Sequence, residues 1–293
     1  MKKIEHPDYL FHGQHGKGPF FEGWYFKLLN ADNYGLVIIP GVFYSIENDH
    51  HHAFIMVADS IKKKSYYKEY SLSTFYSELN RFQVEIDGNV FSDNFIELNL
   101  VIDDFKMVGK VEFSKLIRWK NTFLKAGAMS WYSYMPFMEC YHDVISMNHN
   151  IEGSLKLNST NIDFNKGLGY IEKDWGKRFP ENWIWLQCNN FLSKQNASIM
   201  ISIATVPWLL SEFVGLLAAL VINNEFYLFS TYNNTKIKII ETKKLGFVEI
   251  VLFNKDYLLK VVAKSASQKP LKLYAPDKNK MKLKVDEYLD TKV

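Results

Sequence analysis

The chain has 293 residues, of which 47% are hydrophobic and 23% are charged, a balance that excludes a disordered or fibrous protein. Its 35 basic and 32 acidic residues leave a net charge of +3, which is too even for the electrostatic footprint of a nucleic-acid-binding protein. The aromatic content of 16% is high, and large rings both fill cores and line pockets for flat or greasy ligands.

The first residues contain lysines but no apolar stretch behind them, so we expect no signal peptide. The most apolar segment, 206–222, is interrupted by Glu212, whereas a membrane span needs about 20 apolar residues. This segment is typical of a buried strand or a short helix, and Leu209 to Ala219 is the best helix candidate in the chain. We therefore expect a soluble, cytoplasmic protein in which Cys140 and Cys188 are reduced.

Runs of alternating apolar and polar residues recur along the chain. Residues 82–86 and 95–101 flank Asp87-Gly88, a dipeptide typical of hairpin turns. The second half repeats the pattern over 220–222, 226–229, 236–240, 247–252 and 257–262. Strands at this spacing predict an all-β fold with antiparallel pairing.

Two segments of the chain resemble each other. Residues 16–26 and 176–185 each contain Gly-Lys, a Phe and Pro pair, and Glu-x-Trp, and a strongly apolar strand follows each. We interpret this as a duplicated unit and predict two pseudo-duplicated β-barrels or strongly curved sheets. The boundary is expected in the polar stretch from Asn158 to Phe164, which gives domains 1–160 and 161–293.

Three segments combine aromatic and charged residues densely enough to suggest chemistry. In the first, 18–27, strand alternation places Glu22 and Trp24 on one face and Tyr25 on the other. One interpretation is that Trp24 plugs the end of a barrel while Glu22 caps backbone amides. The other is that an aromatic wall desolvates Glu22, raises its pKa and lets it act as an acid.

The second segment, 128–149, is rich in aromatic residues and methionines and includes Trp131 and Tyr132. It suits either a loop over an apolar cavity or irregular packing. His142 and His149 are seven residues apart with no carboxylate at metal-ligand spacing, so this spacing favours hydrogen-bonded structural histidines and no metal site.

The third segment, 169–180, places Tyr170, Glu172 and Asp174 on one strand face, with Lys173 between the two carboxylates in sequence. It is either a salt-bridged surface turn or the wall of a pocket, and the rings of Tyr170 and Trp175 favour the pocket. The chain contains no nucleotide-binding glycine motif, no Gly-x-Ser-x-Gly elbow and no His-Glu-x-x-His helix.

Residues 20–27, 169–176 and 179–189 resemble the signature blocks of the tocopherol cyclase family, and residues 130–149 are similar to its middle block. The resemblance extends from about Gly18 to Pro276. It implies a pair of lipocalin-like β-barrel domains, with a more distant relation to carotenoid hydratase-type proteins. It also implies closure of a chromanol ring, in which the phenol of a prenylated hydroquinone adds across the nearest alkene of its tail.

Such an addition requires a proton donor and a dry pocket with electron-rich rings around the developing cation, and neither a metal nor a cofactor. From the resemblance we expect Asp174 or Glu172 to be the acid, in a water-poor cleft between the two barrels. Glu22 is the alternative, because a neighbouring Lys173 would disfavour the protonated form of the other two carboxyls. The expected substrate-binding residues are Trp24, Tyr25, Trp131, Tyr132, His142, Tyr170, Lys173, Trp175, Lys177, Trp183, Trp185 and Gln187.

The expected partner is a hydrophobic small molecule, either a prenylated aromatic compound or an isoprenoid, with peripheral membrane contact left open. Two other functions remain. A lipocalin-like barrel can carry an isoprenoid quinone or another lipid without any acid, and water in place of the phenol would make the protein a hydratase.

Overall fold

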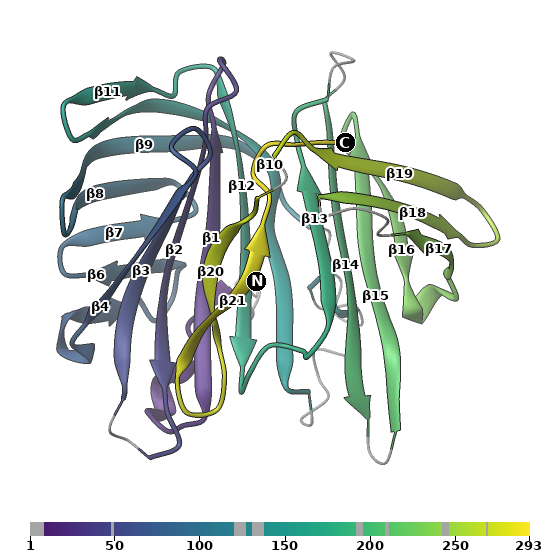
Figure 1. Ribbon diagram of the computed structural model, residues 1–293, viewed down its shortest axis with the longest axis horizontal. Helices are drawn as coiled ribbons and strands as arrows, with labels where there is room; N and C mark the ends of the chain where they lie inside the picture. The colour runs from purple at the N-terminus through teal and green to yellow at the C-terminus, as the bar shows by residue number, and fades with distance from the viewer. Residues whose placement is uncertain are drawn as a thin grey trace, which may run out of the picture. The chain divides into compact units, whose positions relative to one another are not determined.

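A computed structural model describes residues 9–47, 50–119, 127–130, 138–191, 196–208, 211–241, 246–267 and 269–293. Within these ranges the chain forms β-strands and short 3-10 helices such as η2 (Gly13–His15), η3 (Leu72–Thr74) and η5 (Thr231–Asn233), and no α-helix (Figure 1). The predicted all-β class is therefore confirmed. None of the helices in these ranges has the length and apolar character needed to cross a bilayer.

The chain divides into two compact units. The first contains Met1–Phe179 and Leu273–Lys284, and the second contains Pro180–Lys272 and Val285–Val293. This division differs from the expected boundary at residues 158–164. Those residues include β11 (Thr160–Asp163), which pairs with β10 (Cys140–Leu157) inside the sheet of the first unit, so the chain does not leave that sheet there.

The first unit is built on one antiparallel sheet with the strand order β4-β3-β2-β1-β12-β10-β9-β8-β7-β6-β5, and β11 pairs with β10. Its remaining strands are β1 (Phe20–Leu29), β2 (Gly35–Tyr44), β3 (His52–Asp59), β4 (Lys64–Tyr70), β5 (Phe75–Ser77), β6 (Gln83–Ile86), β7 (Asn89–Ser92), β8 (Phe95–Ile102), β9 (Phe105–Ile117) and β12 (Gly167–Gly176). Strand β12 lies between β1 and β10, so segments far apart in sequence become neighbours at the centre of the sheet.

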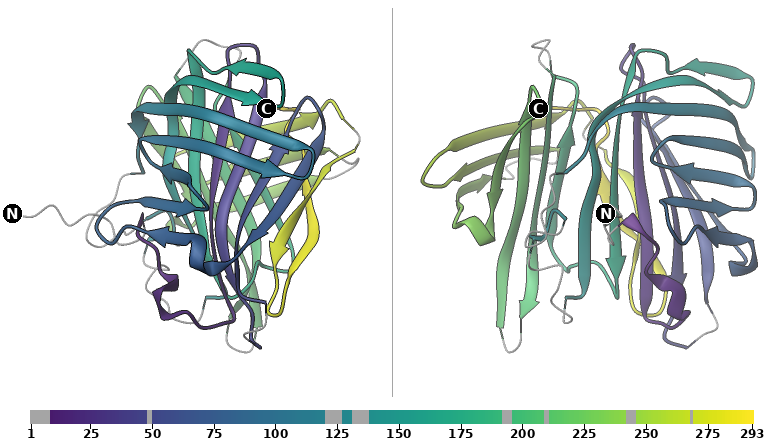
Figure 2. Two further views of the ribbon diagram at one scale, coloured as in Figure 1. Left: turned by 90° about the vertical axis from the view of Figure 1, so that its left-hand side faces the viewer. Right: turned by 180° about the vertical axis from the view of Figure 1, so that it is seen from behind.

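The sheet of the first unit curls until strands from its two halves meet (Figure 2). The Lys68 ammonium of β4 donates to the carbonyl of Val101 on β8 at 2.8 Å, and the rings of Tyr66 and Phe105 stack with centroids 4.0 Å apart. The concave side holds a continuous core that includes Trp24. We call this side the inner face and the opposite side of the same sheet the outer face.

Part of the outer face is covered by a hairpin from the C-terminal end of the chain. The hairpin consists of β20 (Leu271–Pro276) and β21 (Met281–Glu287). The ring of Tyr274 stacks on Tyr67 with centroids 4.4 Å apart, and Met281 packs against a small cluster built around Phe21 and Phe43.

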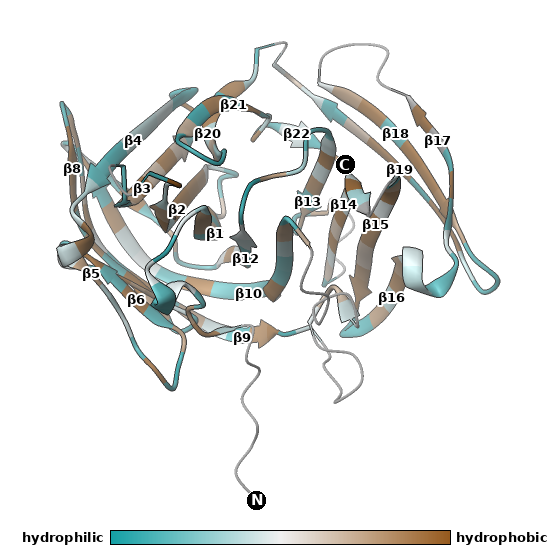
Figure 3. Cartoon of the chain, turned by 90° about the horizontal axis from the view of Figure 1, so that it is seen from below, coloured by the Kyte–Doolittle hydropathy of each residue, from teal (hydrophilic) through white to brown (hydrophobic). Residues whose placement is uncertain are grey.

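The second unit contains two four-stranded antiparallel sheets, in the orders β13-β14-β15-β16 and β17-β18-β19-β22. Its strands are β13 (Trp183–Cys188), β14 (Ala197–Trp208), β15 (Ser211–Ile222), β16 (Glu225–Ser230), β17 (Lys236–Glu241), β18 (Phe247–Phe253), β19 (Leu258–Ser265) and β22 (Thr291–Lys292). One apolar cluster joins residues of both sheets, among them Ile201, Phe229, Ile250 and Val261. Apolar and polar residues alternate along the strands, as Figure 3 shows by colour.

One expectation about this part of the chain is corrected, and a second is not confirmed. The helix candidate Leu209 to Ala219 falls largely on β15, which pairs with β14 from Ala197↔Ile222 to Trp208↔Ser211. Hydrogen bonding to the long neighbouring strand β14 overrides the weak helical pattern of this segment. A buried strand does not need apolar residues at the 3.6-residue period of a helix. The two units also differ in construction, one curled sheet against two smaller sheets, so a pair of duplicated barrels is not confirmed.

Candidate functional site

Strand β12 carries the third candidate segment, and its two faces bear two different sets of charged residues. Side chains alternate along a strand, so Lys173 and Trp175 lie on the inner face while Tyr170, Glu172 and Asp174 lie on the outer face. In register, Lys173 lies beside Trp24 of β1, and Asp174 lies beside His142 of β10. The expected sharing of one face by Tyr170, Glu172 and Asp174 agrees with this register.

The inner cluster consists of Glu22, Lys173, His12, Trp24 and Trp175. The Lys173 ammonium is fully buried and lies 2.5 Å from Glu22 Oε1 and 3.0 Å from His12 Nδ1. It also donates to the carbonyl of Leu10 at 2.5 Å, and it lies over the rings of Trp24 and Trp175 at 5.5 and 4.8 Å from their centroids. The ammonium therefore has three acceptors and two aromatic faces around it.

The N-terminal segment completes this inner cluster. The backbone N–H of His12 donates to Glu22 Oε2 at 2.8 Å, and the imidazole stacks on Trp175 with ring centroids 4.7 Å apart. Sequence reasoning missed His12, because it lies before the first aromatic block and its partner Lys173 is 161 residues away.

The charge on Glu22 decides its chemical role. Burial by itself raises the pKa of this carboxyl, but the attraction of Lys173 and the contacts with His12 outweigh it and lower the pKa below its usual value. Glu22 is therefore a carboxylate at neutral pH. Glu22 was the alternative proton donor, and its lowered pKa disfavours that role, because the lysine that was expected to act on its sequence neighbours lies on the face of Glu22 instead.

The outer cluster consists of His142, Tyr170, Glu172 and Asp174. His142 Nδ1 lies 2.8 Å from Asp174 Oδ1, and His142 Nε2 lies 3.8 Å from Glu172 Oε2. The Tyr170 hydroxyl donates to Glu172 Oε2 at 2.5 Å. Of the two carboxylates, Asp174 has the more accessible side chain, 23% exposed against 5% for Glu172.

His142 and Tyr170 of the outer cluster differ in charge at neutral pH. Burial lowers the pKa of His142, but the charges of Asp174 and Glu172 and the hydrogen bond to Asp174 raise it to about 9. His142 is thus an imidazolium at neutral pH. Burial and the contact with Glu172 raise the pKa of Tyr170 well above its usual value, so Tyr170 remains a neutral donor. The outer cluster therefore holds a proton on His142, next to the side chains of Asp174 and Glu172.

The same three side chains could hold a cation. One ligand atom each from His142, Glu172 and Asp174 can be chosen so that all lie within 4.8 Å of one another. An imidazole and two carboxylates form a donor set suited to zinc or manganese. A divalent ion would compete with the proton of His142 for these carboxylates. The sequence expectation of no metal site rested on spacing along the chain, whereas these ligands come from adjacent strands.

The other expected site residues are dispersed. Trp24, Lys173 and Trp175 lie on the inner face, so they cannot line one cleft with Glu172 and Asp174. Tyr25 lies in register with Glu172 on the outer face, and the Lys177 side chain beyond the end of β12 is exposed. Trp183, Trp185 and Gln187 belong to β13 of the second unit. Trp131 and Tyr132 lie outside the described residues.

The second histidine of the middle segment, His149, is buried and hydrogen-bonded. His149 is buried, its Nδ1 lies 2.9 Å from Ser146 Oγ, and its ring contacts Phe113. Burial, with a smaller effect from Arg118, lowers the pKa of His149 to about 3, so it is neutral. His149 therefore fits the hydrogen-bonded role that its spacing favoured, whereas His142 is an ion held by carboxylates.

Comparisons with known proteins agree with the resemblance seen in these strands. The chain is 31% identical over 61 residues to the chloroplastic tocopherol cyclase of Zea mays, a match that covers 21% of this chain and only 13% of the maize protein. Among solved structures, a putative AttH from Nitrosomonas europaea has a TM-score of 0.54 at 15% identity, covering 90% of this chain and 85% of that one.

The structure of CghA with Sch210972 has a TM-score of 0.53 at 11% identity, covering 88% of this chain and 81% of that one. At sequence identities this low, the two structures indicate a shared fold and nothing about function. The model of the family described as tocopherol cyclase-like matches residues 104–293, which is more than half of the sequence and includes both β10 and β12. The chain belongs to the tocopherol cyclase-like family.

Proposed function

We propose that the protein closes an oxygen-containing ring by acid-catalysed addition of a phenol to a prenyl alkene within one hydrophobic substrate. The observation that carries the proposal is the pairing of a partly exposed carboxyl, Asp174, with a cationic histidine, His142, on a strand that the family model covers. Family membership supplies the reaction class, and the outer cluster supplies a proton at a place a substrate can reach.

In this proposal Asp174 and His142 act as one acid. The proton on His142 Nδ1 moves to Asp174 Oδ1, 2.8 Å away, and the neutral carboxyl then protonates the alkene. A C–H bond forms, the alkene π bond breaks, and a tertiary cation results. The phenol oxygen attacks that cation, and its proton returns to the pair, so substrate and product are isomers.

Glu172 and Tyr170 support this acid. The Glu172 carboxylate lies 3.8 Å from His142 Nε2 and stabilises the imidazolium, while the Tyr170 hydroxyl donates to the same carboxylate oxygen, Oε2. Tyr25, in register with Glu172, offers a ring on the same face, where an aromatic quadrupole attracts a cation by about 0.5–2 kcal/mol. Glu22 has no part in this step, because it is ionised and lies on the inner face.

The test is to incubate the purified chain with a prenylated hydroquinone and to measure the mass of the product. An isomer of unchanged mass supports cyclisation, and a gain of one water indicates the hydratase alternative. Unchanged substrate that co-purifies with the protein indicates a carrier. Adding a chelator separates proton from metal chemistry at the outer cluster, because loss of turnover on chelation would contradict acid catalysis by Asp174 and His142 alone.

Variants assign the acid. Asp174→Asn removes the group that receives the proton, and we expect turnover to fall by roughly 10²- to 10⁴-fold. Asp163→Asn, a matched change at an exposed carboxylate of β11, should leave turnover unchanged. Full activity in Asp174→Asn would rule out the mechanism even if the cyclisation itself were observed.

A further inference from the structure

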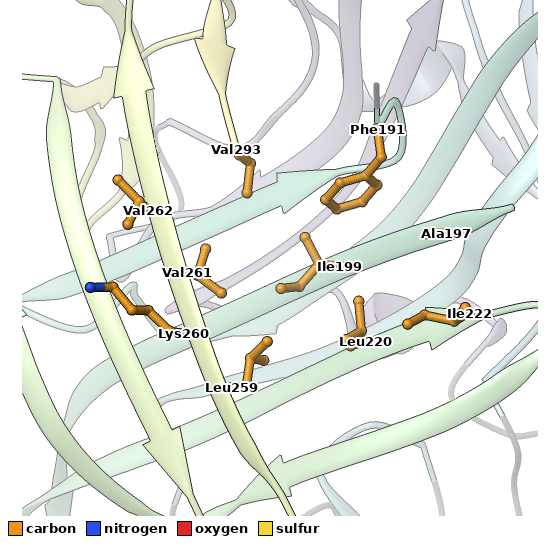
Figure 4. Close-up of a pocket in the computed structure, with 10 residues that line it drawn as sticks. All are labelled: Phe191, Ala197, Ile199, Leu220, Ile222, Leu259, Lys260, Val261, Val262 and Val293. Carbon is orange, nitrogen blue, oxygen red and sulfur yellow. The ribbon is translucent and has the colours of Figure 1, made fainter. Parts of the chain in front are cut away.

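The sheet β17-β18-β19-β22 of the second unit has one face in the core and one face toward solvent. Leu259 and Val261 of β19 pack in the apolar cluster that joins the two sheets of this unit. Alternation along the strand therefore places Leu258, Lys260 and Val262 on the opposite side. Figure 4 shows this division, because Leu259 and Val261 point toward the facing sheet whereas Lys260 and Val262 point away from it.

We call the solvent side of this sheet the exposed face. Cross-strand register places on it Lys236 of β17, Glu249, Val251 and Phe253 of β18, and Leu258, Lys260, Val262 and Lys264 of β19.

Large apolar side chains are accessible on this face. Leu258 is 72% exposed, Val262 41% and Phe253 36%. Leu258 and Phe253 lie side by side in register, and the exposed Tyr257 belongs to the turn that joins their strands. Single apolar residues on a protein surface are ordinary, whereas an adjacent group of them marks a site of interaction.

The same stretch of chain concentrates the protein's positive charge. Residues 236–265 contain seven lysines and three acidic residues, a net charge of +4, whereas the whole chain has +3. On the exposed face Lys260 pairs with Glu249 at 2.7 Å. Lys236 and Lys264 are exposed and form no ion pair with another described residue. The apolar group is therefore bordered by lysines whose charge the protein does not neutralise.

The turn between β18 and β19 is held by its own hydrogen bonds. Asn254 Oδ1 accepts the backbone N–H groups of Asp256 and Tyr257 at 3.0 and 2.9 Å, and the Asn254 N–H donates to the carbonyl of Tyr257 at 3.0 Å. The Tyr257 ring meets Tyr227 of β16 edge-on, with centroids 5.2 Å apart. This turn also carries the exposed Lys255, and it is ordered before any partner arrives, so docking through it costs little conformational entropy.

We propose that the exposed face docks the protein on the surface of an anionic lipid bilayer. Phe253 and Leu258 enter the head-group layer, and the surrounding lysines lie against lipid phosphates. Aromatic and aliphatic side chains next to lysines are typical of proteins that lie on a membrane without spanning it. This docking does not depend on the reaction proposed for the outer cluster.

Two other occupants fit the exposed face less well. A second copy of the chain would bring one lysine-rich face against another, and like charges held together repel. A nucleic acid would match the lysines, but Leu258 and Val262 offer no ring for bases to stack on, and residues 236–265 contain no arginine for bidentate phosphate contacts. A layer of anionic head groups over hydrocarbon satisfies both the charged and the apolar side chains.

The experiment measures co-sedimentation of the full chain with phosphatidylcholine vesicles that contain phosphatidylglycerol, and with vesicles of phosphatidylcholine alone. We expect at least about tenfold tighter binding to the anionic vesicles, because each lysine near the surface contributes roughly fivefold in affinity. Binding should weaken as sodium chloride is added, since salt screens the lysines. Equal affinity for the two kinds of vesicle, or sedimentation with neither, would overturn the proposal.

The apolar part of the face is tested by Leu258→Ser. This variant should bind anionic vesicles about five- to twentyfold more weakly, because most of the leucine side chain no longer gains burial in the bilayer. Ile61→Ser, the same change of character at a residue that is 68% exposed in the first unit, should bind like the parent. Unchanged binding of Leu258→Ser, or an equal loss in both variants, would contradict this placement.

The charged part is tested by the double variant Lys236→Gln with Lys264→Gln, which should bind at least about tenfold more weakly. Lys106→Gln with Lys156→Gln removes the same charge from exposed positions of β9 and β10 and should have little effect. Ultracentrifugation of the lipid-free protein and binding to a DNA duplex examine the other occupants. A dimer that Leu258→Ser abolishes, or DNA bound as tightly as anionic vesicles, would overturn the assignment to a bilayer.

Discussion

Strand β12 places one charged cluster on each of its faces. The two clusters differ in how completely the protein encloses their charged side chains. In the inner cluster Lys173 and Glu22 are both fully buried, and the ammonium contacts three acceptors within 3.0 Å. In the outer cluster the side chain of Asp174 remains 23% exposed and that of His142 remains 13% exposed. The inner charges are therefore enclosed by the protein, whereas the outer cluster keeps one carboxylate, Asp174, in contact with solvent.

This difference shows that a high density of charged and aromatic residues does not by itself mark a reactive site. Both clusters contain a carboxylate, a cation and nearby rings. The inner cluster ties Leu10 and His12 of the N-terminal segment to the central strands, and a group so enclosed cannot meet a substrate without unfolding its own support. In the outer cluster Asp174 keeps an exposed fraction of 23%, which the inner carboxylate Glu22 lacks.

The strongest test of this contrast is the removal of the inner cation. In Lys173→Met the side chain keeps its length but leaves Glu22 buried without its charged partner. Because breaking a buried ion pair typically costs 3–5 kcal/mol, we expect the free energy of unfolding to fall by about that amount. Chemical denaturation of the variant and the parent measures the difference.

The double variant Glu22→Gln with Lys173→Met provides the control. With both charges gone, most of the lost stability should return, because no ion remains desolvated. A double variant that is as unstable as Lys173→Met would mean that packing, rather than charge, determines the effect. Proteolysis near residues 9–16 should increase in the single variant if Lys173 anchors this segment.

The outer cluster should reveal itself through pH. The pKa of His142 is about 9 in the folded chain and about 6.5 in an unfolded one, so the folded state binds an additional proton between these values. Its stabilising effect is complete below about pH 6.5 and is lost as the pH rises through about 9. The shift corresponds to a free energy on the order of 3 kcal/mol.

Thermal melts between pH 6 and pH 10 measure this dependence, with Asp174→Asn as the control. Removing the charge of Asp174 brings the pKa of His142 closer to its ordinary value, so the stability of this variant should vary less over the same range. An equally steep dependence in both proteins would show that His142 is not the titrating group. His149 is neutral in the folded chain and should act in the opposite sense near pH 6, where unfolding lets it take up a proton, and not above about pH 8.

Alternation along a strand is the part of this arrangement that the sequence predicts well. It places Tyr170, Glu172 and Asp174 on one face and Glu22 with Trp24 on one face, and both groupings agree with the register of β1 and β12. Recurrent turns and alternating runs likewise predict the all-β class. These inferences depend only on residues that are close together in the chain.

Pairing between distant strands is what the sequence does not reveal. Lys173 follows Glu172 directly, yet its charge acts on Glu22, 151 residues earlier, because neighbours in a strand point to opposite faces. His142 finds its carboxylates on β12, 30 and 32 residues further along. The conformation of β15, where the sequence offered a helix, is likewise determined by its neighbour β14 rather than by its own pattern. Such contacts follow from topology, which no local pattern contains.

The smallest predicted effect concerns the hydroxyl of Tyr170. In Tyr170→Phe the ring remains, but Glu172 Oε2 loses a donor that lies 2.5 Å away in a buried setting. A hydrogen bond to a charged group contributes about 1.5–3 kcal/mol, so we expect a loss of about 2 kcal/mol in unfolding free energy. The same change at the exposed Tyr76 of β5 should cost less than about 0.5 kcal/mol.

The loss of the Tyr170 hydroxyl should also affect His142. With one donor fewer, Glu172 attracts the imidazolium more strongly, and the pH at which stability declines should move upward. A Tyr170→Phe protein with the stability and pH profile of its parent would show that Tyr170 and His142 are not coupled through Glu172, and the outer cluster would then reduce to the His142–Asp174 pair alone.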